Sequence, residues 1–325
     1  MFFFIQPVFA EETDSPEKPS RNYLINISPQ FGFFYGQAEE IVYSPGQNFK
    51  SDLHSQLLWD MKPVLYYGLL INFSKAKPFE KWGFFSNLSL IKGISGKDGF
   101  KSGIMENRDW LSVENDALTH FSTHDNYTKN LFFLDFNFGF SIPFINKILL
   151  KPLINISYMK LGFYGMDGHG IYARERGANT NLYYPIDDNP IRIQYEGKVI
   201  NYSQVWFLAA PGIALDYHFL KNFNLELSFQ ISPLIMCAAL DEHITTKTQF
   251  RDQPRGGLFL RPALQFSFSF KEIFSLALDF SWRYFTNAKG NAYKKNYGSG
   301  FYSDAGTSGA GLSLFNTALL FKIKL

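Results

Sequence analysis

Hydrophobic and polar residues alternate at every second position along much of the chain. In 134–142, Leu, Phe and Ile fill the even positions, whereas Asp, Asn, Gly and Ser fill the odd ones. The segments 223–232, 260–270 and 274–284 follow a similar pattern. Because successive side chains of a β-strand point to opposite faces, each segment is predicted to be a strand with one apolar and one polar face.

The two faces indicate that the strands lie in a membrane. The apolar face is almost uniformly Phe, Leu and Ile, and the other face carries mostly small, uncharged polar residues, as in strands with lipid outside and a polar lumen inside. A closed barrel has no unpaired strand edges, which lipid would not tolerate. No run approaches 18 consecutive apolar residues, so a helical span is excluded. The aromatic content of 18% suits pleated, half-buried surfaces.

Counting the alternating runs predicts an all-β fold, a ten-stranded antiparallel transmembrane β-barrel that occupies residues 23–325. The expected strands are 23–36, 55–73, 82–94, 129–144, 148–165, 194–219, 222–243, 247–270, 272–288 and 308–325. The connections at 37–54, 95–128, 166–193 and 289–307 are long, and those between them are short. Outer-membrane barrels place long loops outside the cell and short turns in the periplasm. Ten strands leave too narrow a lumen for a general porin, and polar side chains are expected to fill it.

The N-terminal segment and the overall composition add limits. Residues 1–10 resemble the end of a residual signal peptide, and the polar residues 11–22 are predicted to be a disordered periplasmic segment. A net charge of +2 gives no reason to expect nucleic acid binding. The single Cys237 cannot form a disulfide within the chain, and no His or Cys cluster has metal-ligand spacing. Neither a metal nor another cofactor is therefore expected.

Two polar clusters are expected at the loop end of the barrel. The first, 106–110, follows the third strand, and the second contains Asp241 and His243 at the top of the seventh. Residues 241 and 243 share a strand face, so the carboxylate can orient the imidazole and raise its basicity toward water. The alternative interpretation is a solvated loop end. His124, within the second long connection, is interpreted as a solvated loop residue, and the alternative is a residue of the cleft wall.

The sequence resembles the omptin family of ten-stranded outer-membrane endopeptidases over roughly residues 30–325. The resemblance rests on segments that occur in the same order: FYGQAEEIVY (34–43), SQLLW (55–59), GIMENRDW (103–110), DEH (241–243), TNAKGN (286–291) and GAG (309–311).

The resemblance implies catalytic roles for four positions. Asp241 and His243 would activate a water molecule, and Asp109 would be one carboxylate of the pair across the cleft. Asn107 stands where the family has the other carboxylate. An amide can hydrogen-bond but cannot supply negative charge, so the pKa of the histidine should fall. The sequence alone is compatible with proteolytic activity that is retained, altered or lost.

The resemblance also bears on ligands. Glu40 matches one of two acidic residues that bind a basic substrate side chain, and Ala239 replaces the other, which weakens the expected clamp. In the family's lipopolysaccharide-binding cluster, Tyr158 matches but Lys160 and Gly162 do not. We therefore expect outer-membrane lipid around the barrel, but no dependence on lipopolysaccharide.

The sequence thus predicts an endopeptidase that cuts extracellular polypeptides near basic residues, with its active-site end facing the cell exterior. The second hypothesis is a catalytically impaired barrel that serves as a surface adhesin or receptor, and Asn107 and Ala239 favour it. A narrow channel is the third, and the number of strands argues against it.

Overall fold

The computed structural model describes residues 23–43, 51–75, 78–95, 99–271 and 273–325. The predicted signal peptide, 1–10, and the predicted disordered segment, 11–22, lie outside the described residues. No helix among the described residues is long and apolar enough to cross a membrane.

Within the described residues, thirteen antiparallel strands form one sheet. They are β1 (Tyr23–Tyr43), β2 (Leu53–Lys75), β3 (Gly83–Gly93), β4 (Phe100–Asp109), β5 (His120–Ile145), β6 (Ile148–Tyr172), β7 (Ile191–Leu220), β8 (Phe223–Ser232), β9 (Ile235–His243), β10 (Thr248–Arg255), β11 (Phe259–Ser269), β12 (Phe274–Asn296) and β13 (Ser303–Lys324).

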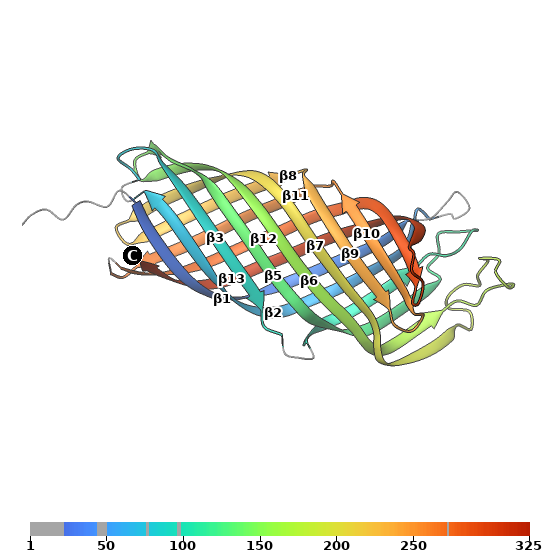
Figure 1. The fold of residues 1–325 in the computed structure, drawn as a ribbon. Coiled ribbons are helices and arrows are strands. Elements are labelled where there is room, and N and C mark those ends of the chain that lie inside the picture. Colours follow the sequence, from blue (N-terminus) through green and yellow to red (C-terminus); the bar gives the residue numbers. More distant parts are fainter. Residues whose placement is uncertain (1–22, 44–50, 76–77, 96–98, 272) are drawn as a thin grey trace, which may run out of the picture.

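The sheet closes on itself as a barrel with ten strand positions (Figure 1). β1 pairs with β2 on one side and with β13 on the other. Three positions are each shared by two strands that lie end to end. β3 and β4 lie between β2 and β5, β8 and β9 follow β7, and β11 and β10 precede β12. The prediction of a ten-stranded barrel is confirmed.

The strands reach much further toward the loop end than the sequence predicted. Most of 95–128, predicted to be a loop, belongs to β4 and to the first part of β5, and the connections 37–54, 166–193 and 289–307 are also shortened by strand extensions. The prediction was wrong there because it followed hydrophobic alternation. Backbone hydrogen bonding continues where the outward side chains have become polar, so the pairing outlasts the pattern.

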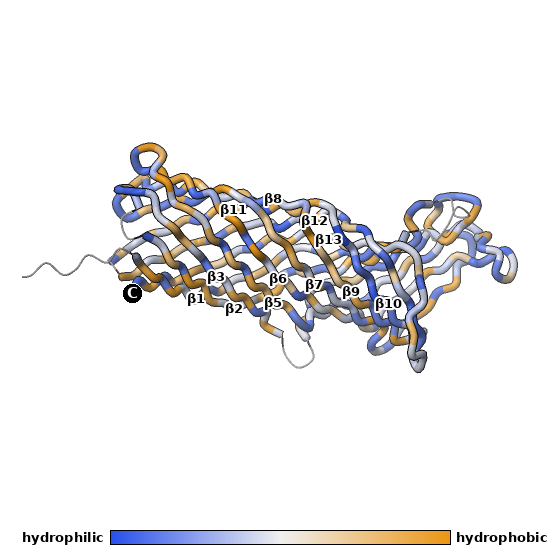
Figure 2. The backbone as a smooth tube through the Cα atoms, turned by 45° about the horizontal axis from the view of Figure 1, so that its top comes forward, coloured by the Kyte–Doolittle hydropathy of each residue, from blue (hydrophilic) through white to orange (hydrophobic). Residues whose placement is uncertain are grey.

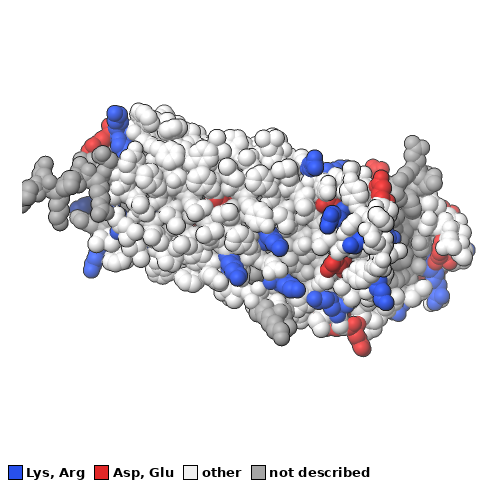
Figure 3. Space-filling view, in the orientation of Figure 1, with Lys and Arg blue, Asp and Glu red and all other residues white. Residues whose placement is uncertain are grey.

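Hydrophobic positions recur along the strands in the middle of the barrel (Figure 2), and the outward-facing ones form an apolar belt. On β1 its outward side chains include Phe31, Phe33 and Tyr35, which are 55%, 40% and 48% exposed. Figure 3 shows a broad band of the wall with almost no charged side chain, whereas charges gather toward the loop end. Beyond the belt the outward side of β1 carries Gln37 and Glu39 instead. The loop-end extensions of the strands therefore stand outside the membrane.

The lumen is filled in two layers. Nearer the turn end, Asp135 forms an ion pair with Arg283 at 2.6 Å, and Lys151 pairs with Glu226 at 2.5 Å. Toward the loop end lies a layer of fully buried aromatic side chains: Phe34, Trp59, Phe133, Phe163, Tyr202, Trp206, Phe259 and Phe285. The expectation of a polar filling is thus right for only one layer. The aromatic layer forms the floor on which the loop-end residues stand.

Replacing Arg283 by Met should destabilise the barrel by about 3 kcal/mol, because Asp135 is left buried without its closest cation. The measurement is urea unfolding of the protein in lipid vesicles. The double variant Arg283→Met, Asp135→Leu is the control and should recover part of the loss, since it removes both charges of the closest pair and leaves only Arg261 without Asp135. Equal stability of the single variant and the unchanged protein would contradict a structural role for the pair.

Candidate active site

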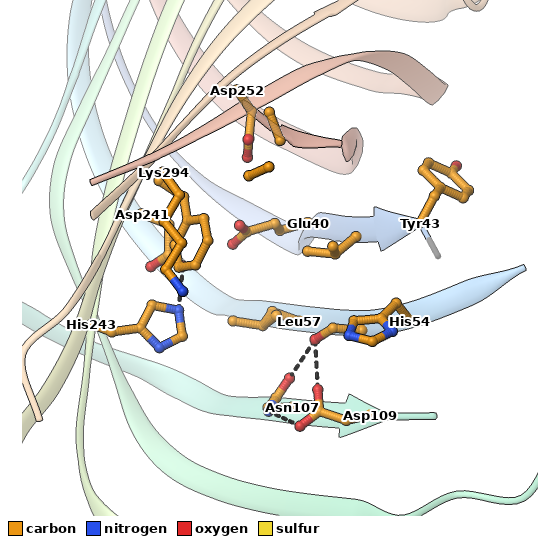
Figure 4. Close-up of a pocket in the computed structure, with 15 residues that line it drawn as sticks. Glu40, Tyr43, His54, Leu57, Asn107, Asp109, Asp241, His243, Asp252 and Lys294 are labelled. Carbon is orange, nitrogen blue, oxygen red and sulfur yellow. Dashed lines mark hydrogen bonds and ion pairs between the residues drawn. The ribbon is translucent and has the colours of Figure 1, made fainter. Parts of the chain in front are cut away.

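A cleft of about 380 Å³ opens at the loop end of the barrel. β9 and β10 form one wall with Asp241, His243 and Asp252, while β2 and β4 form the opposite wall (Figure 4). Glu40 of β1 lies between the walls. Outward neighbours of these positions are polar, as Glu39 is on β1 and Glu242 on β9. The cleft therefore lies beyond the apolar belt.

Asp241 and His243 project from the same face of β9 and contact each other. Nε2 of His243 lies 2.5 Å from Oδ2 of Asp241. The aspartate is 2% exposed, whereas the side chain of the histidine is 35% exposed. When Nε2–H donates to the buried carboxylate, Nδ1 is left as the nitrogen that can accept a proton. The pair has the geometry of an oriented base.

The pKa of His243 is raised above its ordinary value. Burial by itself would lower this pKa, but the charge and hydrogen bond of Asp241, together with the charge of Asp109, outweigh burial. This direction agrees with the sequence-based expectation that Asp241 raises the basicity of His243, whereas the lowering expected from Asn107 in place of a carboxylate stays a prediction.

Asn107 and Asp109 lie across the cleft on β4 and share Ser55 of β2. Oγ of Ser55 is 2.6 Å from Oδ1 of Asp109 and 3.1 Å from Oδ1 of Asn107. Nδ2 of Asn107 donates to Oδ2 of Asp109 at 3.2 Å. Burial raises the pKa of Asp109, although these hydrogen bonds work in the opposite direction. Asn107 thus supports the remaining carboxylate of this wall instead of adding a second one.

A glycine allows an irregularity in the backbone of β4 before this strand reaches the cleft. Gly103 has a φ of 138°, and the register with β5 shifts between Lys101 and Gly103. A Cβ at this position would lie 2.6 Å from Cβ of Asp60 on β2. Only glycine allows this backbone conformation at such close approach. The shift precedes the alternation that turns Asn107 and Asp109 inward.

The structure adds a carboxylate close to Ala239. Ala239 is buried on β9, and Asp252 lies directly opposite it on β10. Asp252 and Glu40 are each 2% exposed, and both line the cleft. Oε2 of Glu40 has no hydrogen-bond partner among the described residues. The strand next to Ala239 therefore carries a carboxyl group at the level of that residue.

Both of these carboxyl groups have raised pKa values. For Asp252, burial and the charge of Asp241 raise the pKa to about 7, against an opposing influence of Ser308. For Glu40, burial and then the charges of Asp241 and Asp252 raise the pKa well above its usual range. Two poorly solvated acids close together in one cleft form a site that favours a cation.

Sequence reasoning did not identify Asp252, Ser55, His54, Phe250 or Lys294, all of which line the cleft. The position of Asp252 follows from the tight turn after β9, which pairs His243 with Thr248 and hence Ala239 with Asp252.

The prediction for His124 was wrong. This residue is 4% exposed on β5, and its Nδ1 lies 2.5 Å from the carbonyl oxygen of Asp167, so it is not a solvated loop residue.

In the described part of the chain, no group of three or more His, Cys, Asp or Glu side chains is arranged to hold a metal ion.

The fold and the cleft define a transmembrane barrel with a polar site at its loop end. The chain belongs to the Omptin family, whose model matches residues 21–324. The confirmed family places it among barrels of the bacterial outer membrane, and its fold is that of an outer-membrane protease.

One solved structure agrees with the family on the fold. The crystal structure of the outer membrane protease OmpT from Escherichia coli superposes with a TM-score of 0.78 at 19% identity, covering 93% of this chain and 97% of that one. The translocator domain of the autotransporter NalP from Neisseria meningitidis gives a TM-score of only 0.33 at 9% identity, with 92% and 88% covered. No curated protein sequence matches the chain.

The imidazole of His243 should titrate above pH 6.5, and replacing Asp241 by Asn should lower that midpoint because an attractive charge is lost. The measurement is NMR of histidine side chains in detergent micelles. His120, whose pKa burial lowers to about 4, is the internal control and should not respond. A His243 midpoint that is unaffected by Asp241→Asn would contradict the assigned contact.

Proposed function

We propose that the protein is an endopeptidase in which Asp241 and His243 activate a water molecule for attack on a peptide carbonyl. The observation that carries the proposal is the 2.5 Å contact between the buried Asp241 and the partly exposed His243, in a cleft with Asp109 on the opposite wall. Membership of the Omptin family supports the same reaction. Because outer-membrane barrels carry their long loops outside, the cleft would face the cell exterior.

The proposed reaction uses His243 as a general base. Nδ1 takes a proton from water while the water oxygen bonds to the carbonyl carbon, and Asp241 stabilises the imidazolium that forms. The same proton then passes to the nitrogen of the leaving amine as the C–N bond breaks. General base catalysis of this kind contributes about 10²–10⁴-fold to the rate.

The network around Asn107 supports activity despite the missing carboxylate. Ser55 and Asn107 both hydrogen-bond to Asp109, so its position across from His243 is fixed. A single oriented carboxylate is enough to accept a hydrogen bond from the attacking water. We therefore infer that the substitution at 107 modifies the site but leaves it competent.

The paired acids support a basic substrate side chain. Glu40 and Asp252 lie deeper in the cleft than His243, since Asp252 is opposite Ala239, four residues before His243 on β9. A Lys or Arg side chain between them would favour their ionised forms and gain charge-assisted hydrogen bonds. We infer that polypeptides are cut beside basic residues. Asp252 would bind the basic side chain together with Glu40, in place of the carboxylate that Ala239 lacks.

A surface adhesin or receptor is the second candidate. Large apolar side chains are exposed near the loop tips, with Phe301 87% exposed and Tyr184 and Tyr297 each 45% exposed. Exposed aromatic residues of this kind are common at protein interfaces. The third hypothesis, a narrow channel, is opposed by the aromatic layer that fills the lumen beneath the cleft. Independence from lipopolysaccharide stays a prediction.

Refolded protein in detergent micelles should cleave a mixed peptide library beside Lys or Arg, and His243→Ala should lower the rate at least about 100-fold because the base is lost. His218→Ala is the matched control. His218 also lies two residues after an aspartate, 3.3 Å from Asp216, but at the turn end of the barrel.

Heat-modifiable migration on gels should confirm that every variant is folded. Cleavage that survives His243→Ala would exclude the proposed mechanism. Absence of cleavage by the unchanged protein, with activity gained in Asn107→Asp, would instead favour the adhesin or receptor.

Asp252→Asn should raise KM for substrates with Lys or Arg about 10-fold or more, because a hydrogen bond to a charged group contributes about 1.5–3 kcal/mol. For the unchanged protein, the same KM should rise as pH falls through about 7, where Asp252 gains a proton. Moving the carboxylate across the strands, in Asp252→Ala with Ala239→Asp, should restore tight binding. A KM that does not respond to Asp252→Asn would remove this residue from the substrate site.

A further inference from the structure

The cleft has an unusual charge balance for a site that must hold an anionic intermediate. Carboxyl groups enter it from β1, β4, β9 and β10, as Glu40, Asp109, Asp241 and Asp252. Water addition to a peptide carbonyl creates an oxyanion, and ionised carboxylates repel it. Among the described residues that line the cleft, Lys294 is the one lysine or arginine.

Lys294 stands in one cross-strand row with the catalytic pair. Asp241 of β9 is opposite Phe250 of β10, and Phe250 is opposite Lys294 of β12. Nζ of Lys294 lies 5.6 Å from the centre of the Phe250 ring, and the His243 ring lies 5.5 Å from the same ring. The lysine and the histidine therefore flank one aromatic side chain, and in Figure 4 Lys294 extends toward His243.

The ammonium group remains available to a ligand. The described residues include no carboxylate that forms an ion pair with Lys294, and the side chain is exposed within the cleft. Phe250 provides an uncharged surface beside it, to which a cation is attracted without being neutralised. The Lys294 charge nevertheless acts at the site: burial and Lys294 lower the pKa of His243, against the opposing effect of Asp241 and Asp109.

We propose that Lys294 is a further catalytic residue, whose ammonium group donates a hydrogen bond to the oxyanion of the tetrahedral intermediate. This inference rests on the proposed endopeptidase function. As water adds, the carbonyl π electrons move to oxygen, the proton goes to His243, and Lys294 remains protonated. When the intermediate collapses, these electrons re-form the carbonyl and the amine leaves with the proton from His243.

An oxyanion contact has a kinetic signature of its own. The interaction exists only after water has added, so it stabilises the transition state and not the bound substrate. A lysine that bound an acidic side chain of the substrate would act in the ground state, and only on substrates with such a side chain. Steady-state kinetics with two matched peptides separate these roles.

The experiment compares Lys294→Met and Lys294→Arg on two peptides that differ only in Ala or Asp after the cleaved bond. For both peptides, Lys294→Met should lower kcat about 10²–10³-fold with little change in KM, and Lys294→Arg should keep most of the rate. The acidic limb of the kcat/KM profile should also move to higher pH in Lys294→Met, since a charge that lowers the pKa of His243 is gone.

Lys295→Met is the matched control. Lys295 is the next residue of β12, and its ammonium lies 4.8 Å from the centre of the Tyr302 ring and does not line the cleft. Its loss should leave kcat unchanged. Alkylation of Lys294→Cys with 2-bromoethylamine rebuilds a lysine-like amine and should restore kcat. Cys237 is buried, so unchanged protein treated in the same way should keep its rate.

The outcomes separate the two proposals. Full kcat in Lys294→Met, while the unchanged protein cleaves, would overturn the inference and leave the proposed function intact. A loss confined to KM for the Asp peptide would also overturn it and assign Lys294 to substrate binding. Absence of cleavage by the unchanged protein would overturn the proposed function, and the inference with it.

Discussion

Closure of the hydrogen-bonded ring is the constraint on which the rest of the structure depends. In lipid every backbone N–H and C=O must find a partner within the protein, and a closed antiparallel sheet provides one at each position. The ring does not end where the lipid ends. β1, β2, β5, β6, β7, β12 and β13 continue past the apolar belt, and β4, β9 and β10 complete the ring there. The candidate site is therefore built on strands and not on loops, so cross-strand register fixes its side chains.

The aromatic layer beneath the cleft affects the pKa values of the acidic residues in the cleft. Trp59 stacks on Tyr202 with ring centres 5.3 Å apart, and Trp206 packs against Phe285 at 4.6 Å. This layer lies between the charged lumen and the cleft, and Glu40 and Asp252 are each 2% exposed. Poor solvation raises the pKa of both acids, and a cationic ligand relieves the same penalty. The packing that fills the barrel beneath the cleft thus also helps to bury the two acids on which the proposed recognition of a basic side chain depends.

The sequence predicts the barrel well because period-two alternation reports directly on a lipid-facing surface. It predicts the strand ends poorly, since β4 and the first part of β5 have polar outward residues and lose the pattern while the pairing continues. The adjacency of Asp241 and His243 could be predicted because two residues of one strand suffice for it. Asp252 and Lys294 could not, because each reaches the site from a different strand. Their placement depends on the hairpin after β9 and on the pairing of β10 with β12, which residue spacing along one strand does not encode.

The effect of the amide at position 107 depends on the charges of the whole cleft and not only on those of the wall formed by β2 and β4. A second carboxylate there would lie beside Asp109, whose pKa burial already raises, and would add repulsion toward any oxyanion. Asn107 instead donates to Asp109 at 3.2 Å and keeps that carboxylate in place without further charge. The Asp241–His243 pair keeps its own internal support, because the raised pKa of His243 depends more on adjacent Asp241 than on the opposite wall. The departure at 107 therefore reduces the negative charge facing the cleft, and under the proposed mechanism it leaves the Asp241–His243 base in place.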